Sequence, residues 1–196
     1  QSITLPPGLT SLPDFTFEDC SGLQSVTLPA GLTSLPNVAF NSCSRLQSIT
    51  LPPGLTSLPD HAFLGCSGLQ SVTLPAGLTS LPMFAFANCS RLQSITPPDS
   101  LTQLGKAAFA YCSGLQSITL PDFLTHIYDK AFAGCSGLPP SQTLSLRVHH
   151  PSELSYSAWC SGLQSVTLPP DLTSLPECAF HGCPKLQSII PTRLSQ

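Results

Sequence analysis

The cysteines are the residues of this chain that could most readily bind a metal or form disulfide bonds, and they are regularly spaced. Of the nine cysteines, eight recur at one place in a repeating phrase, mostly 23 residues apart, as from Cys20 to Cys43. These eight are Cys20, Cys43, Cys66, Cys89, Cys112, Cys135, Cys160 and Cys183. Zinc sites need further ligands at short spacing, and no Cys-x-x-Cys pair or suitably spaced His accompanies them. Because cysteine is among the most buried residue types, we expect one inward-facing column in the core.

Disulfide bonds within this column are an alternative. In-register cysteines of adjacent coils would have Cα atoms about 5 Å apart, which is within bonding range, although parallel Cβ directions give poor S–S torsions. The ninth cysteine, Cys178, stands outside the column, where other units carry Phe15 or Val38. We interpret it either as an exposed thiol or as a half-buried filler. The pattern therefore predicts a column of sulfur atoms and leaves their oxidation state open.

The cysteines belong to a repeat whose opening leucine returns at Leu23, Leu46, Leu69, Leu92 and Leu115. A period of roughly 20–29 residues with leucines at set offsets is typical of a solenoid, in which stacked coils bury an apolar face that no coil buries alone. The predicted fold is a curved repeat solenoid of α/β type. It has a parallel β-sheet on one face and few or very short helices.

Each repeat unit contains two extended segments and two corners. The alternation from Ser25 to Leu28 is typical of a strand with one buried face, which Pro29 ends. Gly31 is expected to allow the change of direction that follows. A second extended run covers Leu32–Pro36, and the spacing of Phe40 and Cys43 suits one helical or 3₁₀ turn.

Two longer-range features overlie the repeat. Units alternate between the sequences ITLPPG and VTLPAG. We expect this alternation to matter little because Ile and Val are near-equivalent on a buried strand face.

We expect one domain over residues 1–196, with about eight coils, a partial one and a degenerate coil at 138–162. His149, His150 and Glu153 in that coil suggest a metal cluster or a bulged loop. A piece of a longer array is the simplest account of the chain.

Composition excludes several classes of function. Only 9% of the residues are charged, against about 25% in typical domains, and the net charge is −3. Nucleic-acid binding needs Lys and Arg to replace counterions, so we exclude it. No apolar run reaches the roughly 18 residues of a membrane span. Phosphate loops, nucleophile elbows and paired carboxylates are missing from the sequence, which predicts a non-enzymatic protein without cofactor or metal.

Two surfaces are candidates for binding. The outward Ser and Thr of the strands form a flat ligand surface, a solvated face with cross-strand hydroxyl pairs, or an ice-ordering array. Residues differ most between units in the segment between Leu-Pro and Cys, which encodes either a partner surface or drift at tolerant loop positions. The candidate partner residues are Asp14, Asp60, His61, Phe84, Lys106, Tyr128, Asp129, Lys130, Trp159 and Glu177.

The phrase Leu-x-x-Val-x-Leu-Pro, followed by Leu-x-x-Leu-Pro-x-x-Ala-Phe-x-x-Cys, resembles the BspA-like leucine-rich repeats of microbial surface and secreted proteins. The resemblance covers nearly the whole chain except about Pro139–Trp159. It implies a leucine-rich-repeat solenoid that serves as a protein-interaction or adhesion module, with a protein or glycan partner. The resemblance implies a cell-surface or secreted location, and the composition does not exclude a cytoplasmic one. A structural spacer without a specific ligand is the alternative function, and ice binding comes third.

Overall fold

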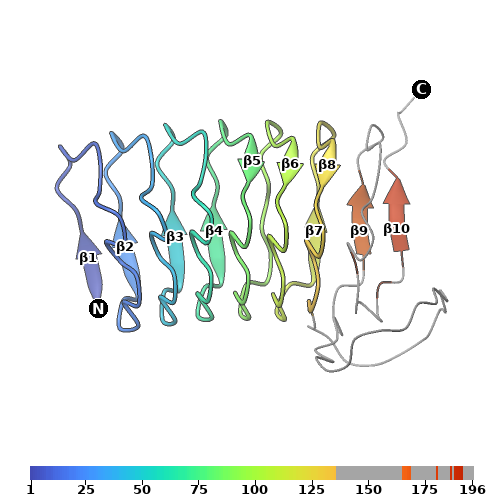
Figure 1. Ribbon diagram of the computed structural model, residues 1–196, viewed down its shortest axis with the longest axis horizontal. Coiled ribbons are helices and arrows are strands. Elements are labelled where there is room, and N and C mark those ends of the chain that lie inside the picture. The colour runs from blue at the N-terminus through green and yellow to red at the C-terminus, as the bar shows by residue number, and fades with distance from the viewer. Residues whose placement is uncertain (136–164, 169–179, 181–185, 187, 192–196) are drawn as a thin grey trace.

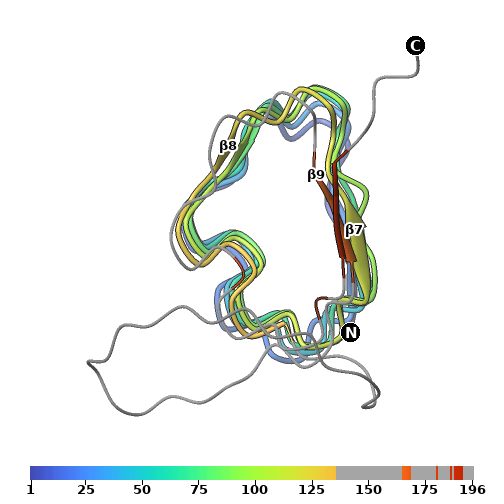
Figure 2. The same cartoon turned by 90° about the vertical axis from the view of Figure 1, so that its right-hand side faces the viewer.

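The chain forms the predicted repeat solenoid, with parallel strands stacked along one axis (Figure 1). The computed structural model describes residues 1–135, 165–168, 180, 186 and 188–191. Viewed along the axis, successive coils superpose as a flattened ring (Figure 2). We number the coils along the chain as follows: first 1–22, second 23–45, third 46–68, fourth 69–91, fifth 92–114 and sixth from 115.

The main row of strands follows the sequence prediction. It comprises β1 (Ser2–Thr4), β2 (Ser25–Thr27), β3 (Ser48–Thr50) and β4 (Ser71–Thr73), then β7 (Ser117–Thr119), β9 (Ser165–Leu168) and β10 (Ser188–Pro191). They pair in parallel in the orders β1-β2-β3-β4 and β10-β9-β7. Ile49 and Val72 are buried between outward, exposed Ser and Thr, as the period-2 pattern predicts.

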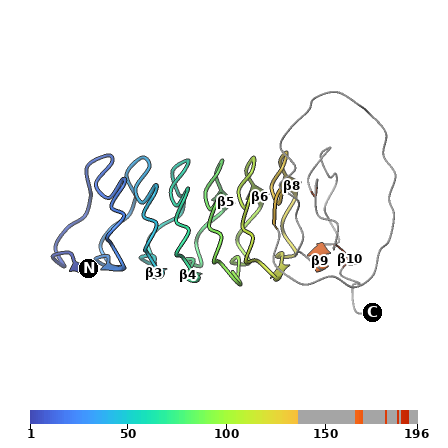
Figure 3. The same cartoon turned by 90° about the horizontal axis from the view of Figure 1, so that it is seen from below.

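A second face of the ring also carries strands, whereas the sequence predicts a sheet on one face. Strands β5 (Ser80–Leu81), β6 (Gln103–Leu104) and β8 (His126–Ile127) form a parallel three-stranded sheet. It lies across the ring from β7 (Figures 2 and 3). The second extended segments of the fourth, fifth and sixth coils make this sheet because their amides also bond between coils, as from Thr102 N–H to Thr79 O at 2.8 Å.

The segment around Phe40 and Cys43 makes a single turn of the kind predicted, in which the Cys43 N–H bonds to Phe40 O at 3.2 Å, and it does not continue as a helix; the described residues contain no helix. Val38 and Ser42 adopt φ of 52° and 60°, and equivalent residues of the other described coils share this left-handed conformation. Left-handed residues break the succession of α-type dihedrals that a helix requires. The Phe40 N–H therefore bonds to Ala62 O of the next coil at 2.9 Å, which adds a third inter-coil ladder.

The corner glycines do not have the role that the sequence predicts. Gly31 lies outside the left-handed region, and a Cβ added there would meet no atom closer than 3.9 Å. Ser100 and Phe123 occupy the equivalent place in the fifth and sixth coils. Left-handed glycines occur instead in the later turn, at Gly65 and Gly134. The corner after each main strand therefore needs no glycine conformation.

Columns of identical side chains fill the ring. A continuous stack of Phe rings runs along the axis with centroid separations of 5.1 to 5.6 Å between neighbours. Its members are Phe17, Phe40, Phe63, Phe86, Phe109, Phe132 and Phe180. Offset stacking of this kind adds to the free energy of burial. No coil could bury such a ring alone, so the stack ties each coil to its neighbours.

Cysteines at the position of the predicted column are buried in the described residues. The side chains of Cys43, Cys66, Cys89, Cys112 and Cys135 are fully buried, and neither these nor the partly exposed Cys20 form disulfide bonds. Each buried thiol donates to the Phe carbonyl of the preceding coil, as from Cys66 Sγ to Phe40 O at 3.0 Å. Cys160, Cys178 and Cys183 lie outside the described residues.

Burial sets the protonation of the column. It raises the pKa of the Cys43 and Cys112 thiols to about 12 from 9.0, with the neighbouring Cys20 adding to the shift at Cys43. Burial also raises the pKa of Cys66 and Cys89. The thiols are therefore protonated at neutral pH, as donors to the Phe carbonyls must be.

The extent of strand pairing alternates along the chain in step with the alternation between ITLPPG and VTLPAG units. This is contrary to the expectation that the alternation between the two kinds of unit matters little. Strand β1 pairs with β2 over three residues and β3 with β4 over three, but β2 meets β3 only at Ser25 and Ser48. Residues 94–96 of the fifth coil form no strand. One reason is Pro97, which lacks the N–H that Leu51 donates to Thr73 O in a closed pair.

Candidate interaction surface

The strand face presents small hydroxyl groups that bond to one another or to solvent. Ser25 Oγ donates to Ser2 Oγ of the preceding coil at 2.9 Å. The Ser and Thr of β3 and β4 are exposed on either side of a buried residue. A row of small hydroxyls lacks the aromatic and Arg side chains that dominate binding energy at protein interfaces. We therefore looked for larger exposed groups on the turn segment.

Two of the predicted partner residues instead hold neighbouring coils together. Asp14 accepts from the Asn37 backbone N–H at 2.9 Å through Oδ1, and from Asn37 Nδ2 at 3.1 Å through Oδ2. Asp60 Oδ1 accepts from the Met83 N–H at 3.0 Å in the same way. Both carboxylates thus satisfy an amide at the start of the next turn. Their place before a left-handed residue explains their type, because short polar side chains bond readily to nearby backbone.

His61 and Phe84 form a stacked pair along the solenoid axis. Their ring centroids are 5.3 Å apart with an interplanar angle of 21°. Both residues adopt a left-handed backbone, with φ of 59° and 54°, and both are half-buried. The pair covers the turn between the third and fourth coils. It therefore offers a partner one edge of each ring instead of a free side chain.

The fifth and sixth coils bring the other described candidates together. Lys106, Tyr128, Asp129 and Lys130 are all exposed. Backbone bonds place 128–130 beside 104–107, since Tyr128 N–H bonds to Leu104 O and Ala107 N–H to Asp129 O, each at 2.9 Å. Four side chains from two coils thus gather on one edge of the ring.

Tyr111 adds a second exposed tyrosine to this edge. It lies in the same turn as Lys106 and leaves 42% of its side chain exposed, against 48% for Tyr128. Its ring lies over Gly134 of the next coil, where an added Cβ would overlap it. Gly134 has a φ of +74°, so both space and conformation call for glycine there. We call Lys106, Tyr111, Tyr128, Asp129 and Lys130 the turn-edge patch.

The turn-edge patch includes side chains of both signs of charge and two aromatic rings. Lys106 and Lys130 are cationic and Asp129 is anionic, so the patch has one excess positive charge in a chain whose net charge is −3. His126 stacks near Tyr128, with ring centroids 6.3 Å apart. Tyrosine presents a large apolar body with a polar tip and loses little conformational entropy on binding. This combination suits recognition of a protein surface.

Phe123 is an exposed aromatic that sequence reasoning does not single out. Its side chain is 67% exposed at the corner after β7. The available signal is its place in the unit, because Gly31, Gly54 and Gly77 stand at the same position in earlier coils. Two further candidates, Trp159 and Glu177, lie outside the described residues.

Among the described residues, no three His, Cys, Asp or Glu side chains are grouped so as to hold a metal ion. Likewise, the part of the chain that the structure describes has no helix long and apolar enough to cross a membrane. The arrangement that remains is a solenoid with a hydroxyl-bearing strand face and an aromatic, charged turn edge. These features define a leucine-rich-repeat protein that has parallel strands and a helix-free turn side.

A family model described as the BspA type leucine rich repeat region matches residues 1–113 and 56–187, in six copies. The chain belongs to this family of BspA-type leucine-rich repeat proteins. No curated protein matches it significantly. Family membership agrees with the resemblance seen in the repeat wording and with the observed solenoid.

Solved structures of bacterial leucine-rich repeat proteins share the fold. One is the leucine-rich repeat protein of T. pallidum, TpLRR, with 25% identity and a TM-score of 0.67 over 97% of this chain and 67% of that one. A protein from Bacteroides ovatus has 26% identity and a TM-score of 0.58 over 87% of this chain and 40% of that one. One from Eubacterium ventriosum has 24% identity and a TM-score of 0.64, covering 79% and 45%.

Proposed function

We propose that this chain is a non-enzymatic protein-interaction module that binds its partner through the turn-edge patch. The observation that carries the proposal is the gathering of two exposed tyrosines and three charged side chains on one edge, from two adjacent coils. Membership of a repeat family that commonly serves in protein interaction supports it. An adhesive role at a cell surface is the finer form of the same proposal.

The strand face supports binding less well. Its side chains are mostly Ser and Thr, and the row is interrupted in the fifth coil, where residues 94–96 form no strand. The interruption also counts against an ice-ordering array, which depends on regular spacing of hydroxyls. A spacer solenoid without a ligand has no such requirement, and it is the outcome if the patch proves inert.

A phage-displayed protein-domain library, panned on the purified chain, tests the proposal. The double variant Tyr111→Ala/Tyr128→Ala removes both rings and is expected to weaken selected binders at least about tenfold, since buried aromatic anchors are each worth 1–2 kcal/mol or more. The matched control is Ser117→Ala/Thr119→Ala, on the strand face of the sixth coil. It is expected to bind as the wild type does.

Three outcomes contradict the proposal. Equal loss of binding in the control variant would place the partner on the strand face. Selective binding to a glycan array, with loss in the tyrosine variant, would assign the same patch to carbohydrate. Failure to select any binder, together with unchanged behaviour on reversing the charge of Lys106 and Asp129, would favour the spacer.

A further inference from the structure

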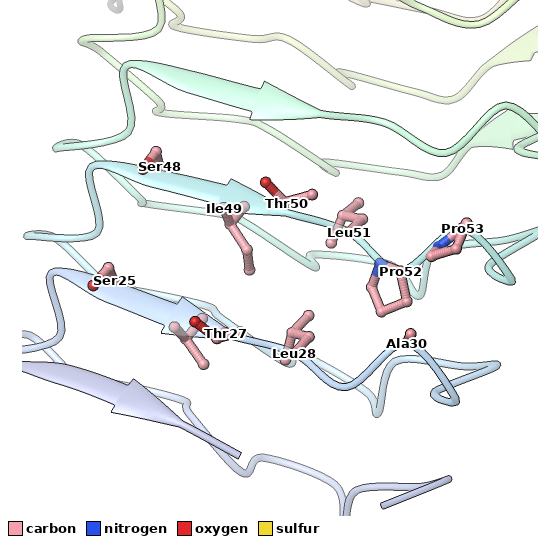
Figure 4. A pocket seen from close by; sticks show the side chains of 11 residues that line it. Ser25, Thr27, Leu28, Ala30, Ser48, Ile49, Thr50, Leu51, Pro52 and Pro53 are labelled. Atoms are coloured by element: carbon pink, nitrogen blue, oxygen red, sulfur yellow. The ribbon is translucent and has the colours of Figure 1, made fainter. Parts of the chain in front are cut away.

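Two pockets open between coils on the strand face, and both lie at the same kind of junction. One, of about 370 Å³, lies between the second and third coils (Figure 4). The other, of about 530 Å³, lies between the fourth and fifth coils. In each case a coil with the VTLPAG wording precedes one with the ITLPPG or ITPPDS wording. We call these two places the open seams.

Backbone hydrogen bonds distinguish the open seams from the closed junctions. At closed junctions the Leu5 N–H bonds to Thr27 O at 3.1 Å, and the Leu51 N–H to Thr73 O at 3.2 Å. The corresponding amides at the open seams belong to Leu28 and Leu74, and within the described structure neither has a hydrogen-bond partner. Each seam thus presents an unused N–H donor beside a pocket that the same residue lines.

Glycines at one corner of the ring accompany the alternation of junctions. A Cβ at Gly68 would lie 2.6 Å from Ser44 O, and one at Gly114 would lie 2.7 Å from Ser90 O, so glycine permits a close backbone approach there. Gly68 and Ser44 lead into the closed pair of β4 and β3, whereas Arg45 and Arg91 hold the place of Gly68 before the strand segments that follow the open seams. We interpret each open seam as a junction that lacks this close approach.

The lining of the seams selects the chemistry of an occupant. The first pocket has no charged side chain: Thr27 and Thr50 supply hydroxyls, while Val26, Ile49 and Pro53 supply apolar surface. Figure 4 shows Ala30 of one coil near Pro52 and Pro53 of the next. The second pocket carries only Asp99 as a charged group, which disfavours an anionic occupant. An uncharged ligand with hydrogen-bond acceptors and apolar groups suits both.

The spacing of the seams selects the conformation of the occupant. Ring centroids of successive coils lie 5.3 Å apart from Phe40 to Phe63 and 5.2 Å apart from Phe63 to Phe86, so two seams separated by two coils are roughly 10 Å apart. A polyproline II peptide has three residues per turn and rises about 3.1 Å per residue, so equivalent carbonyls recur every 9.3 Å or so and face the same way. In a β-strand, residues three apart point to opposite faces. The polyproline II conformation also leaves its carbonyls free to accept.

We propose that the open seams form a repeated docking site for an uncharged polyproline II peptide. The peptide runs along the solenoid axis, and its carbonyls at positions i and i+3 accept from the Leu28 and Leu74 N–H groups. Its apolar groups rest between Ala30 or Ala76 of one coil and the prolines of the next. This site is separate from the turn-edge patch, so either proposal stands without the other.

Amide-resolved hydrogen exchange and NMR test the proposal in two stages. Without ligand, the Leu28 and Leu74 amides are expected to exchange at least about tenfold faster than that of Leu51. A capped peptide of repeated Gln-Pro-Pro units is then expected to shift and protect the Leu28 and Leu74 amides and to leave that of Leu51 unchanged. A capped Gln-Gly-Gly peptide of equal length is expected to bind at least about tenfold more weakly.

Matched variants locate the site. Ala30→Leu and Ala76→Leu place larger side chains at exposed positions beside the pockets, and together they are expected to abolish the peptide effect. Pro7→Leu, at the equivalent exposed corner of a closed junction, is expected to leave it unchanged. Slow exchange of Leu28 and Leu74 overturns the open seams. Open seams without peptide binding, equal binding of the glycine peptide, or equal loss in Pro7→Leu overturns the proposed occupant.

Discussion

At the scale of single residues, this chain uses cysteine as a small apolar residue with one weak donor. The Sγ atoms of Cys43 and Cys66 lie 2.9 Å and 3.0 Å from Phe carbonyls of the coil before. A side chain without a donor would leave those carbonyl oxygens with fewer hydrogen bonds inside a dry core, and this would lower the stability of the fold. The column is therefore structural, and its raised pKa values follow from burial.

The thiols make stability depend on alkaline pH. The pKa of Cys112 is about 12 in the folded chain against 9.0 for an ordinary thiol, so between these values the unfolded state binds fewer protons. The contribution of the thiols to the free energy of unfolding is accordingly constant below pH 9 and falls above it, by up to about 1.4 kcal/mol per pH unit for each thiol. Urea denaturation from pH 7 to 11 measures the slope.

Cys112→Ala is the control for that slope, because tyrosines and lysines also titrate in this range. The variant is expected to be less stable at pH 7 and to lose stability more slowly above pH 9. An unchanged slope would mean that the thiol is as accessible to solvent in the folded chain as in the unfolded one.

At the scale of the elements, the alternation between two kinds of unit affects the structure. The residue that matters is the glycine at the end of alternate units, and the Ile/Val exchange does not account for the effect. Gly68 and Gly114 let the backbone approach the preceding coil closely, whereas Arg45 and Arg91 hold the same place in alternate coils. The alternation of closed and open strand pairs accompanies this exchange. Such coupling between a corner and the strand that follows it arises because each coil packs as a unit against the next.

Gly68→Ala and Gly54→Ala form a matched pair that tests the close approach at Gly68. A methyl at Gly68 would lie 2.6 Å from Ser44 O and force the backbone to move, whereas one at Gly54 would lie 3.9 Å from Leu32 O, which is ordinary van der Waals contact. We expect Gly68→Ala to lower the free energy of unfolding by about 1–3 kcal/mol, as overpacking does. Gly54→Ala should leave it unchanged or raise it by about 0.4–1 kcal/mol. Thermal and urea denaturation compare the two, and equal effects would refute the close approach.

At the scale of the whole molecule, nearest-neighbour contacts dominate. The Phe stack and the thiol bonds connect each described coil to the adjacent one, and the backbone ladders add hydrogen bonds between neighbouring coils. Stability in such an array is approximately a sum of coil terms and interface terms. A lesion in one coil is therefore expected to spread to its neighbours and no further.

Phe63→Ala tests this locality. Phe63 is fully buried, and its ring stacks on Phe40 at 5.3 Å and on Phe86 at 5.2 Å. Its removal is expected to cost about 3–5 kcal/mol through lost burial and the cavity left behind. Native-state hydrogen exchange should show lost protection in the second to fourth coils, with the sixth unaffected. Phe63→Leu is the milder control, and uniform loss along the chain would contradict the model of neighbour coupling.

The sequence by itself determined the solenoid, the main strands, the Phe and Cys columns, and the edge on which exposed groups gather. These follow from a period, and a period fixes which side chains lie above one another before any coordinate is known. Within the candidate site, Lys106, Tyr128, Asp129 and Lys130 could be assigned to one edge in the same way. Tyr111 belongs to the same variable segment, and its exposed ring emerged only from the packing on Gly134.

Only the tertiary structure decided what depends on contact between coils. It assigned Asp14 and Asp60 to backbone amides of the next turn, and it placed left-handed residues that bond between coils before and within the expected turn. It also revealed a second sheet and the open seams at Leu28 and Leu74. The physical reason is that a repeat unit specifies its own pattern of polar and apolar residues, whereas the tilt and hydrogen bonding between two units depend on small differences in backbone clearance.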